Sequence, residues 1–163
     1  MKMNNIKAVL FDLNVTLVPS IFQSDRRLEN VKQIIAKIKR AKYKVGIVSN
    51  CTHREVLKKI EELGIGGFID AIATPKNEYE KKPRRKIFFK AMEKLDVKPS
   101  QTLFVGDHLV YDIFGARLCG MKTMLIKKKF KTYHKLIFSL KPIFGPDFFA
   151  NNLREVLDVL RRL

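Results

Sequence analysis

The sequence contains few of the features that define several common protein classes. Its two cysteines, Cys51 and Cys119, are too few and too far apart for a disulfide framework or a zinc cluster. No apolar run approaches the roughly 20 residues that a membrane-spanning helix needs. The stretch 1–7 is polar, whereas a signal peptide needs a longer apolar stretch and a small-residue cleavage site. We therefore expect a soluble, cytoplasmic protein with free thiols.

Acidic residues are scarce as well. The chain has 16 Asp and Glu against 33 Lys and Arg, a formal net charge of +17. Such an excess favours polyanionic partners such as nucleic acid, phosphorylated ligands or an anionic membrane surface. A lysine-rich, solvated surface of the kind found in thermophile proteins explains the same numbers, so composition alone leaves both interpretations open.

What the sequence does contain is an alternation of short apolar runs with stretches that carry apolar residues at helical spacing. The pattern predicts strands at 6–11, 45–48, 68–73, 103–105 and 123–126, and helices at 25–41, 52–63, 83–95, 112–118 and 153–163. Such alternation is typical of an α/β fold with a parallel sheet. The 163 residues suit one domain, 1–163.

Local signals also mark helix ends. Thr52 and Glu55 have the spacing of a capping box, and Pro83 is a favoured first helical residue. Gly64 and Gly120 follow the last periodic residues of two predicted helices, so we expect those helices to stop there.

One segment interrupts the alternation. Residues 127–141 contain six lysines and no acid, interleaved with aromatic and aliphatic side chains. A basic amphipathic stretch of this kind can lie on anionic membranes or nucleic acid. It can equally be a surface element whose aromatic side chains pack on the sheet edge, and we treat approximately 127–145 as an insert.

Polar groups follow three of the predicted strands: Asp12, then Ser49 and Asn50, then Asp107. In open α/β sheets, ligands bind outside the carboxyl ends of the strands. A single aspartate there is usually a cap or turn former. Two aspartates with a hydroxyl, an amide and the downstream Lys82 point instead to a metal–phosphate site.

The chemistry of phosphate monoesters explains these residue types. The esters are anionic, so a carboxylate nucleophile can approach only when a cation screens the repulsion. Mg²⁺ prefers oxygen ligands and needs only one or two carboxylates, which Asp12 and Asp107 can supply. Lys82 would neutralise the transferring phosphoryl group, while Ser49 and nearby backbone N–H groups bind its oxygens.

Four motifs, in this order, resemble those of the haloacid dehalogenase-like (HAD) superfamily. They are Asp12-Leu13-Asn14-Val15-Thr16 after an apolar strand, Val45-Gly46-Ile47-Val48-Ser49-Asn50, Lys82-Pro83 followed by Ile87-Phe88, and Val105-Gly106-Asp107 with Asp112. The resemblance covers roughly residues 6–126, and Pro146-Asp147 with the last helix is similar to the usual family ending.

The resemblance implies a three-layer Rossmann-like core and a Mg²⁺-dependent phosphatase or phosphotransferase that forms an aspartyl-phosphate. By analogy, Asp12 is the nucleophile, and the metal is held by Asp12, Asp107 and the backbone carbonyl of Asn14. The implied phosphate-binding set is Thr16, Ser49, Asn50 and Lys82, the last also catalytic as the charge clamp. Asp112 would orient Lys82 or a metal-bound water.

The sequence departs from the family at positions 14 and 15, where phosphatases usually carry aspartate and glycine. Asn14 cannot donate or accept a proton as a carboxyl does, and such a group contributes about 10²–10⁴-fold to rate. The chain is then a slow phosphatase or phosphotransferase, a phosphoryl-binding relative without turnover, or a protein with an engineered Asp→Asn change. His53 and His108 are candidate replacement proton carriers, although such histidines are more often solvated or at helix starts.

The spacing of the motifs leaves no room for a cap domain. Positions 13–48 and 50–81 are filled by the predicted helices and a strand, which resembles the capless branch of the family. Capless sites are open and tend to accept macromolecular or lipid-linked phosphates, or to use an oligomer partner as a lid. The basic run 81–86 either attracts such polyanions or is a solvated helix face.

Two non-enzymatic alternatives remain at this stage. The first is a catalytically silent binding protein for nucleic acid or an anionic membrane surface. The second is a structural subunit whose aromatic-rich residues 130–149 form a homo-oligomer interface.

Overall fold

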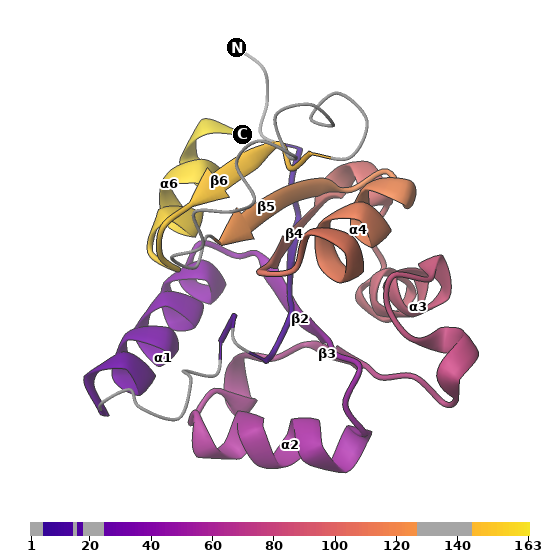
Figure 1. The fold of residues 1–163 in the computed structure, drawn as a ribbon. Coiled ribbons are helices and arrows are strands. Elements are labelled where there is room, and N and C mark those ends of the chain that lie inside the picture. The colour runs from indigo at the N-terminus through magenta and orange to yellow at the C-terminus, as the bar shows by residue number, and fades with distance from the viewer. Residues whose placement is uncertain (1–4, 15, 18–24, 127–144) are drawn as a thin grey trace.

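The strands form a single parallel sheet in the order β3-β2-β1-β4-β5-β6. The structure is a computed structural model that describes residues 5–14, 16–17, 25–126 and 145–163. The strands are β1 (Ala8–Phe11), β2 (Lys44–Val48), β3 (Ala71–Ala73), β4 (Thr102–Gly106), β5 (Lys122–Ile126) and β6 (Phe148–Ala150). The helices are α1 (Asp25–Arg40), α2 (His53–Glu62), α3 (Arg85–Leu95), α4 (Gly115–Leu118) and α6 (Glu155–Arg162) (Figure 1). Short 3-10 turns lie at Gly66–Phe68, Glu78–Glu80 and Pro99–Gln101, and a π-helical turn at Leu109–Phe114.

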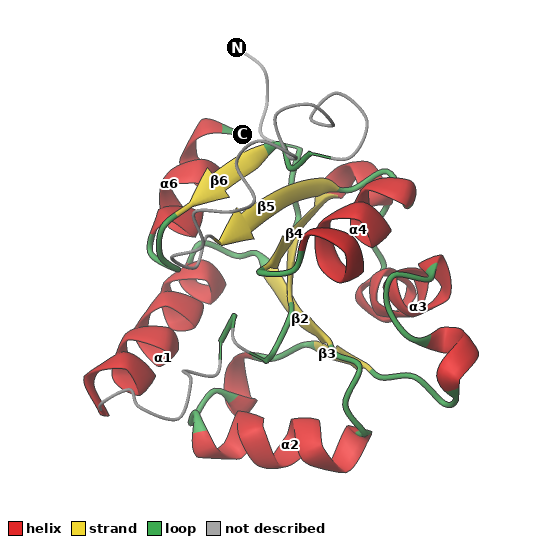
Figure 2. Cartoon of the chain, in the orientation of Figure 1, coloured by secondary structure: helices red, strands yellow, loops and turns green. Residues whose placement is uncertain are grey.

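Helices cover both faces of the sheet, so the domain has three layers (Figure 2). The division follows from the strand repeat of two, which sends alternate side chains to opposite faces. In β1, Val9 and Phe11 pack with α1, α2 and α6, whereas Ala8 and Leu10 pack with α3 and α4. All four β1 side chains are fully buried. This confirms the predicted α/β fold and explains why the strands are apolar throughout.

The predicted helix ends are confirmed at α2 and after α4. Thr52 and Glu55 form a reciprocal capping box at the start of α2. Gly64 and Gly120 adopt positive φ angles of 62° and 84°, which residues with a side chain rarely adopt. The predicted helix at 83–95 instead begins at Arg85, and the one at 112–118 is a π-helical turn followed by the short α4.

The predicted strand at 68–73 is too long. Its first residue ends the 3-10 turn Gly66–Phe68, and only Ala71–Ala73 pairs with β2. The reason lies in Asp70, whose carboxylate accepts the N–H of Val45 at 2.7 Å and pairs with Lys39 at 2.6 Å. These tertiary contacts anchor the chain where a longer strand was expected.

The strand β6 was not predicted, because three residues are too few to show a strand pattern. It pairs in parallel with β5. Asp147, just before β6, accepts the N–H and O–H of Thr123 at 2.8 and 3.0 Å. The basic stretch 127–141, which precedes this contact in the sequence, lies outside the described residues.

The connectivity makes the end of β1 a switch point of the sheet. From β1 the chain passes to β2 on one side, and it later returns to β4 on the other side. At such a switch point the loops on the two sides diverge, and ligands bind there in open α/β sheets. No helix in the described part of the chain is both long enough and apolar enough to cross a bilayer.

Gly106, at the end of β4, leaves room for the side chain of Asp112 to pack against its backbone. A Cβ at this position would lie 2.5–2.6 Å from Asp112 side-chain atoms. We expect Gly106→Ala to displace Asp112 and to lower the free energy of unfolding by about 1–3 kcal/mol. Urea unfolding followed by circular dichroism measures the change. Gly67→Ala is the matched control, since nothing lies within 4 Å of its added Cβ; equal stability of the two variants would contradict the prediction.

Candidate active site

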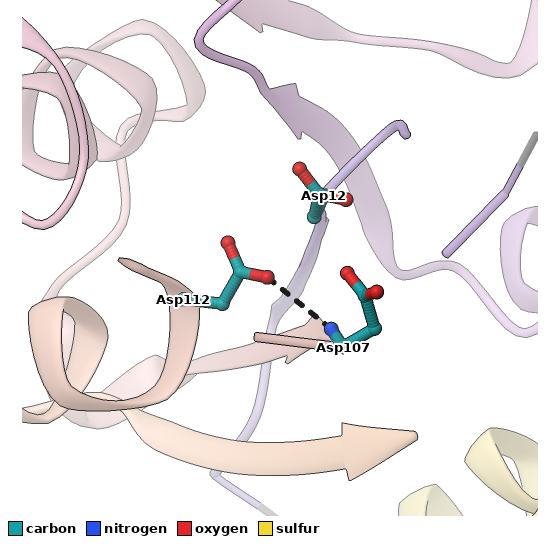
Figure 3. A group of neighbouring side chains, drawn as sticks. All are labelled: Asp12, Asp107 and Asp112. Atoms are coloured by element: carbon teal, nitrogen blue, oxygen red, sulfur yellow. Dashed lines mark hydrogen bonds between the residues drawn. The ribbon is translucent and has the colours of Figure 1, made fainter. Parts of the chain in front are cut away.

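Three carboxylates meet near the carboxyl ends of β1 and β4 (Figure 3). Asp12 follows β1, Asp107 follows β4, and Asp112 lies in the π-helical turn after β4. One oxygen from each lies within 4.8 Å of the other two. The expected meeting of positions 12 and 107 is therefore present, because β1 and β4 are neighbours in the sheet. Bonds of about 2.1 Å place two oxygens of one Mg²⁺ no more than about 4.2 Å apart, so a small shift of these side chains would let them share one ion.

The ammonium of Lys82 lies between two of these carboxylates. Its Nζ donates to Oδ1 of Asp12 at 2.5 Å and to Oδ1 of Asp112 at 2.7 Å, and the residue is only 5% exposed. Asn50 holds the backbone of Lys82: its Oδ1 accepts the Lys82 N–H at 2.8 Å, and its Nδ2 donates to the Lys82 carbonyl at 3.4 Å. The loops after β2 and before α3 are thereby joined.

Asp112 is engaged through both of its oxygens. Oδ1 accepts from Lys82, while Oδ2 accepts the backbone N–H groups of Asp107 and His108 at 3.2 and 3.1 Å. The residue is 1% exposed. Of the two roles that the sequence left open for Asp112, this arrangement favours the orientation of Lys82.

Burial and neighbouring charges shift the pKa values of Asp12 and Lys82. Desolvation raises the pKa of Asp12 to about 6, against the opposing attraction of Lys82. Burial also disfavours the charged form of Lys82, but Asp112 and Asp12 outweigh that effect and raise its pKa. Lys82 therefore stays an ammonium.

The site as described has an excess of negative charge that suits a divalent cation. Three carboxylates, on Asp12, Asp107 and Asp112, lie around one buried ammonium, that of Lys82, and these four residues together have a formal charge of −2. Only Asp107 of the three is half-buried; the other two are buried. Oxygen donors with this net charge fit Mg²⁺.

Of the expected phosphate-binding residues, Ser49 and Asn50 directly follow β2, and Thr16 lies beside Asp107. The Thr16 hydroxyl donates to Oδ1 of Asp107 at 3.4 Å, and the Oγ of the fully buried Ser49 accepts the N–H of Cys51 at 3.2 Å. The side chain of Asn50 is engaged with the Lys82 backbone, so any phosphate contact of Asn50 would come from its backbone N–H. The phosphate-binding roles of these residues remain predictions.

Neither candidate histidine has a geometry that suggests proton transfer. The Nδ1 of His108 accepts the N–H groups of Val110 and Tyr111, both at 3.2 Å, and its ring lies 4.4 Å from that of Tyr111. His53 is exposed as the first residue of α2. Both fit the interpretation as helix-start residues.

Sequence reasoning missed two contacts of Asn14. Its Nδ2 donates to the Sγ of Cys51 at 3.0 Å, and its Oδ1 accepts from the Nζ of Lys59 on α2. Cys51 is a free thiol, as expected, but it belongs to the site rather than being spare. Lys59 is three residues after the buried Val56 and so leans toward the inner face of α2. That spacing is the only signal that points to it.

Sequence and structure comparisons find several similar proteins. A sequence model of haloacid dehalogenase-like hydrolases matches residues 20–126. The chain is 31% identical over 137 residues to the glyceraldehyde 3-phosphate phosphatase of Pyrococcus furiosus, covering 84% of this chain and 55% of the relative. It is 29% identical over 135 residues to pyrophosphatase PpaX of Bacillus mycoides, covering 83% and 60%. The chain thus spans little more than half the length of these curated relatives.

The solved structures show the same fold. A HAD phosphatase from Thermococcus onnurineus has a TM-score of 0.72 at 19% identity, covering 95% of this chain and 98% of that one. The L-2-haloacid dehalogenase of Xanthobacter autotrophicus has a TM-score of 0.74 at 16% identity, covering 96% and 98%. At such identities the likeness concerns the fold alone.

The raised pKa of Asp12 generates a stability prediction. A carboxyl whose pKa rises from 3.8 to about 6 on folding contributes stability at low pH that is lost as the pH rises through about 6. We therefore expect Asp12→Asn to stabilise the Mg²⁺-free protein at pH 7.5 by on the order of 1–3 kcal/mol, and by less at pH 5.

Thermal unfolding in EDTA at the two pH values measures this change. Added Mg²⁺ should raise the Tm of the unchanged protein and have little effect on Asp12→Asn. If Asp12→Asn is less stable than the unchanged protein at pH 7.5 without metal, burial does not destabilise the ionised form of Asp12.

Proposed function

Because the chain belongs to the haloacid dehalogenase-like hydrolases, we propose that it is a Mg²⁺-dependent phosphohydrolase with Asp12 as its nucleophile. The observation that carries the proposal is the buried ammonium of Lys82, held at 2.5 Å from Asp12 and 2.7 Å from Asp112, beside the carboxylate of Asp107. The relatives named as phosphatase and pyrophosphatase support phosphoryl transfer as the reaction class. A cytoplasmic location and a capless, single-domain organisation over 1–163 are part of the same proposal.

Three groups would hold the metal: the side chains of Asp12 and Asp107 and the backbone carbonyl of Asn14. When bound, Mg²⁺ would screen the negative charge of the phosphoryl oxygens from the attacking carboxylate.

The chain's own residues account for the two chemical steps. A carboxylate oxygen of Asp12 attacks phosphorus, the bond from phosphorus to the leaving oxygen breaks, and that oxygen takes a proton from solvent. Water then attacks the aspartyl-phosphate, which releases phosphate and restores the carboxylate. Lys82 stabilises the charge on the phosphoryl oxygens in both steps, together with Thr16, Ser49 and backbone N–H groups such as that of Asn50.

Asn14 makes the proposed turnover slow. A carboxamide cannot protonate the leaving oxygen or activate water, so the reaction depends on charge stabilisation and positioning. Good leaving groups, which need little protonation, are therefore the best substrates for a first assay.

We expect Asn14→Asp to raise the rate of Mg²⁺-dependent phosphate release from p-nitrophenyl phosphate. The gain should be about 10- to 100-fold, at or below the low end of the usual contribution of a general acid–base group, because Lys59 lies against this position and favours the ionised carboxylate. Asp12→Asn should abolish activity in both backgrounds. No gain from Asn14→Asp would show that the amide is not what limits the rate.

A binding function without turnover is the second candidate, and Asn14 together with the charge of +17 favours it. The exposed residues Arg84 and Arg85 begin α3 next to Lys82. Their neighbour Lys86 pairs with Glu80 at 2.9 Å, and Arg84 lies over the ring of Tyr79, so part of this face is internally paired. Macromolecular or lipid-linked phosphates, nucleic acid, an anionic surface and a homo-oligomer are the partners this function would involve.

We expect the phosphohydrolase to lose all activity on Asp12→Asn. Salt-sensitive binding to RNA, DNA or anionic vesicles that persists in Asp12→Asn, with no phosphate release from the unchanged protein, would support the binding function instead. Filter binding and vesicle sedimentation at 50 and 200 mM salt measure this, since contacts to phosphate groups weaken steeply over that range.

A further inference from the structure

A second lysine reaches the candidate active site, from a different element than Lys82. Lys59 lies on α2, and its Nζ donates to Oδ1 of Asn14, two residues beyond Asp12. The Nδ2 of Asn14 donates in turn to Cys51, directly after Ser49 and Asn50. Lys59 is thereby held at the junction of the loops that follow β1 and β2.

The two lysines differ in how their charge is compensated. The ammonium of Lys82 contacts two carboxylates and is buried. Lys59 is half-buried, and its ammonium forms no ion pair with the acidic side chains that the structure describes, although the hydrogen bonds of Thr52 and, after them, the charge of Lys59 lower the pKa of Glu55 one turn earlier on α2. Its ammonium donates a hydrogen bond to the neutral amide of Asn14. Less of the charge of Lys59 than of Lys82 is therefore compensated by described side chains, and this leaves Lys59 available to an anionic ligand.

The exposed fractions of the site residues indicate on which side of Asp12 the rest of a substrate would lie. Asp12, Lys82 and Asp112 form the floor of the site, with exposures of 6%, 5% and 1%. Asn14 and Lys59 are half-buried and so lie nearer the opening. A phosphoryl group held on Asp12 would leave the rest of its substrate toward solvent, past this rim.

We propose that Lys59 is a specificity-determining residue that binds a second anionic group of the substrate, a carboxylate or a phosphate, close to the phosphoryl group. The substrate class is thus a phosphate ester or anhydride that carries a second anionic group next to the phosphoryl group. The inference rests on the proposed function only in placing the phosphoryl group at Asp12.

Asn14 has a place in this arrangement. Its amide oxygen orients the ammonium of Lys59 without neutralising it. A carboxylate at position 14 would form an ion pair with Lys59 and compete with the second anionic group of a ligand. The neutral residue that slows turnover therefore also leaves Lys59 available for recognition.

Non-hydrolysable phosphonates test the inference by binding alone. Ethylphosphonate, phosphonoacetate and methylenediphosphonate share one P–CH₂ unit, which carries a methyl, a carboxylate or a second phosphonate. Calorimetry with the full chain in Mg²⁺ would compare the unchanged protein with Lys59→Met, Lys59→Arg and Lys58→Met. Lys58 is the matched control, since it is the neighbouring lysine on α2 and its side chain is 78% exposed.

We expect Lys59→Met to weaken binding of one or both doubly anionic ligands by about 10- to 100-fold, the usual effect of losing a hydrogen bond between charged groups. The loss for ethylphosphonate should be at least tenfold smaller. Lys59→Arg should retain most of the preference and Lys58→Met all of it. Which ligand loses more identifies the second group as carboxylate or phosphate.

Asn14→Asp provides an independent measurement, because its carboxylate should lower the preference for the doubly anionic ligands without removing Lys59. Equal losses for all three ligands on Lys59→Met, or a loss no larger than for Lys58→Met, would overturn the inference. Selective binding without phosphate release from p-nitrophenyl phosphate would support Lys59 and reject the proposed turnover. Phosphate release from p-nitrophenyl phosphate without selective binding would support the proposed turnover and reject the role of Lys59.

Discussion

The ammonium of Lys82 is the contact on which the candidate site depends. It joins Asp12 at the end of β1 to Asp112 in the turn after β4, and it comes from the loop before α3. Three segments that are distant in sequence are thus tied at one buried point. Two carboxylates left there without the lysine would be uncompensated buried charges, which are strongly destabilising. The rest of the site is arranged around keeping this ammonium in place.

The side chains of Asn50 and Asp112, next to Lys82, also bind backbone groups. Asn50 binds both the N–H and the carbonyl of Lys82, and Asp112 accepts two backbone N–H groups with its second oxygen. Gly106 leaves the space that Asp112 occupies. The geometry of the candidate site is therefore set by the strand ends and tight turns, and only in part by the long side chains.

The site also reverses the overall charge of the chain. A protein with a net charge of +17 gathers three of its 16 acids at one edge of the sheet. Lys82 compensates part of that charge, and Lys59 adds a positive charge at the rim. An acidic floor suits a divalent cation, whereas a basic rim suits the anionic substrate that would approach it.

The sequence by itself determined the fold class, because buried parallel strands must be continuously apolar and their helices must show one apolar face. It also determined the residues at the strand ends, since Asp12, Ser49 and Asp107 each directly follow a strand and the ends of parallel strands share one edge. Only the tertiary structure decided β6 and the start of β3, which depend on the contacts of Asp147 and Asp70 with distant strands. It alone showed that Asn14 contacts Cys51 and Lys59, because a long side chain on a helix has no sequence signal for the partner that it reaches.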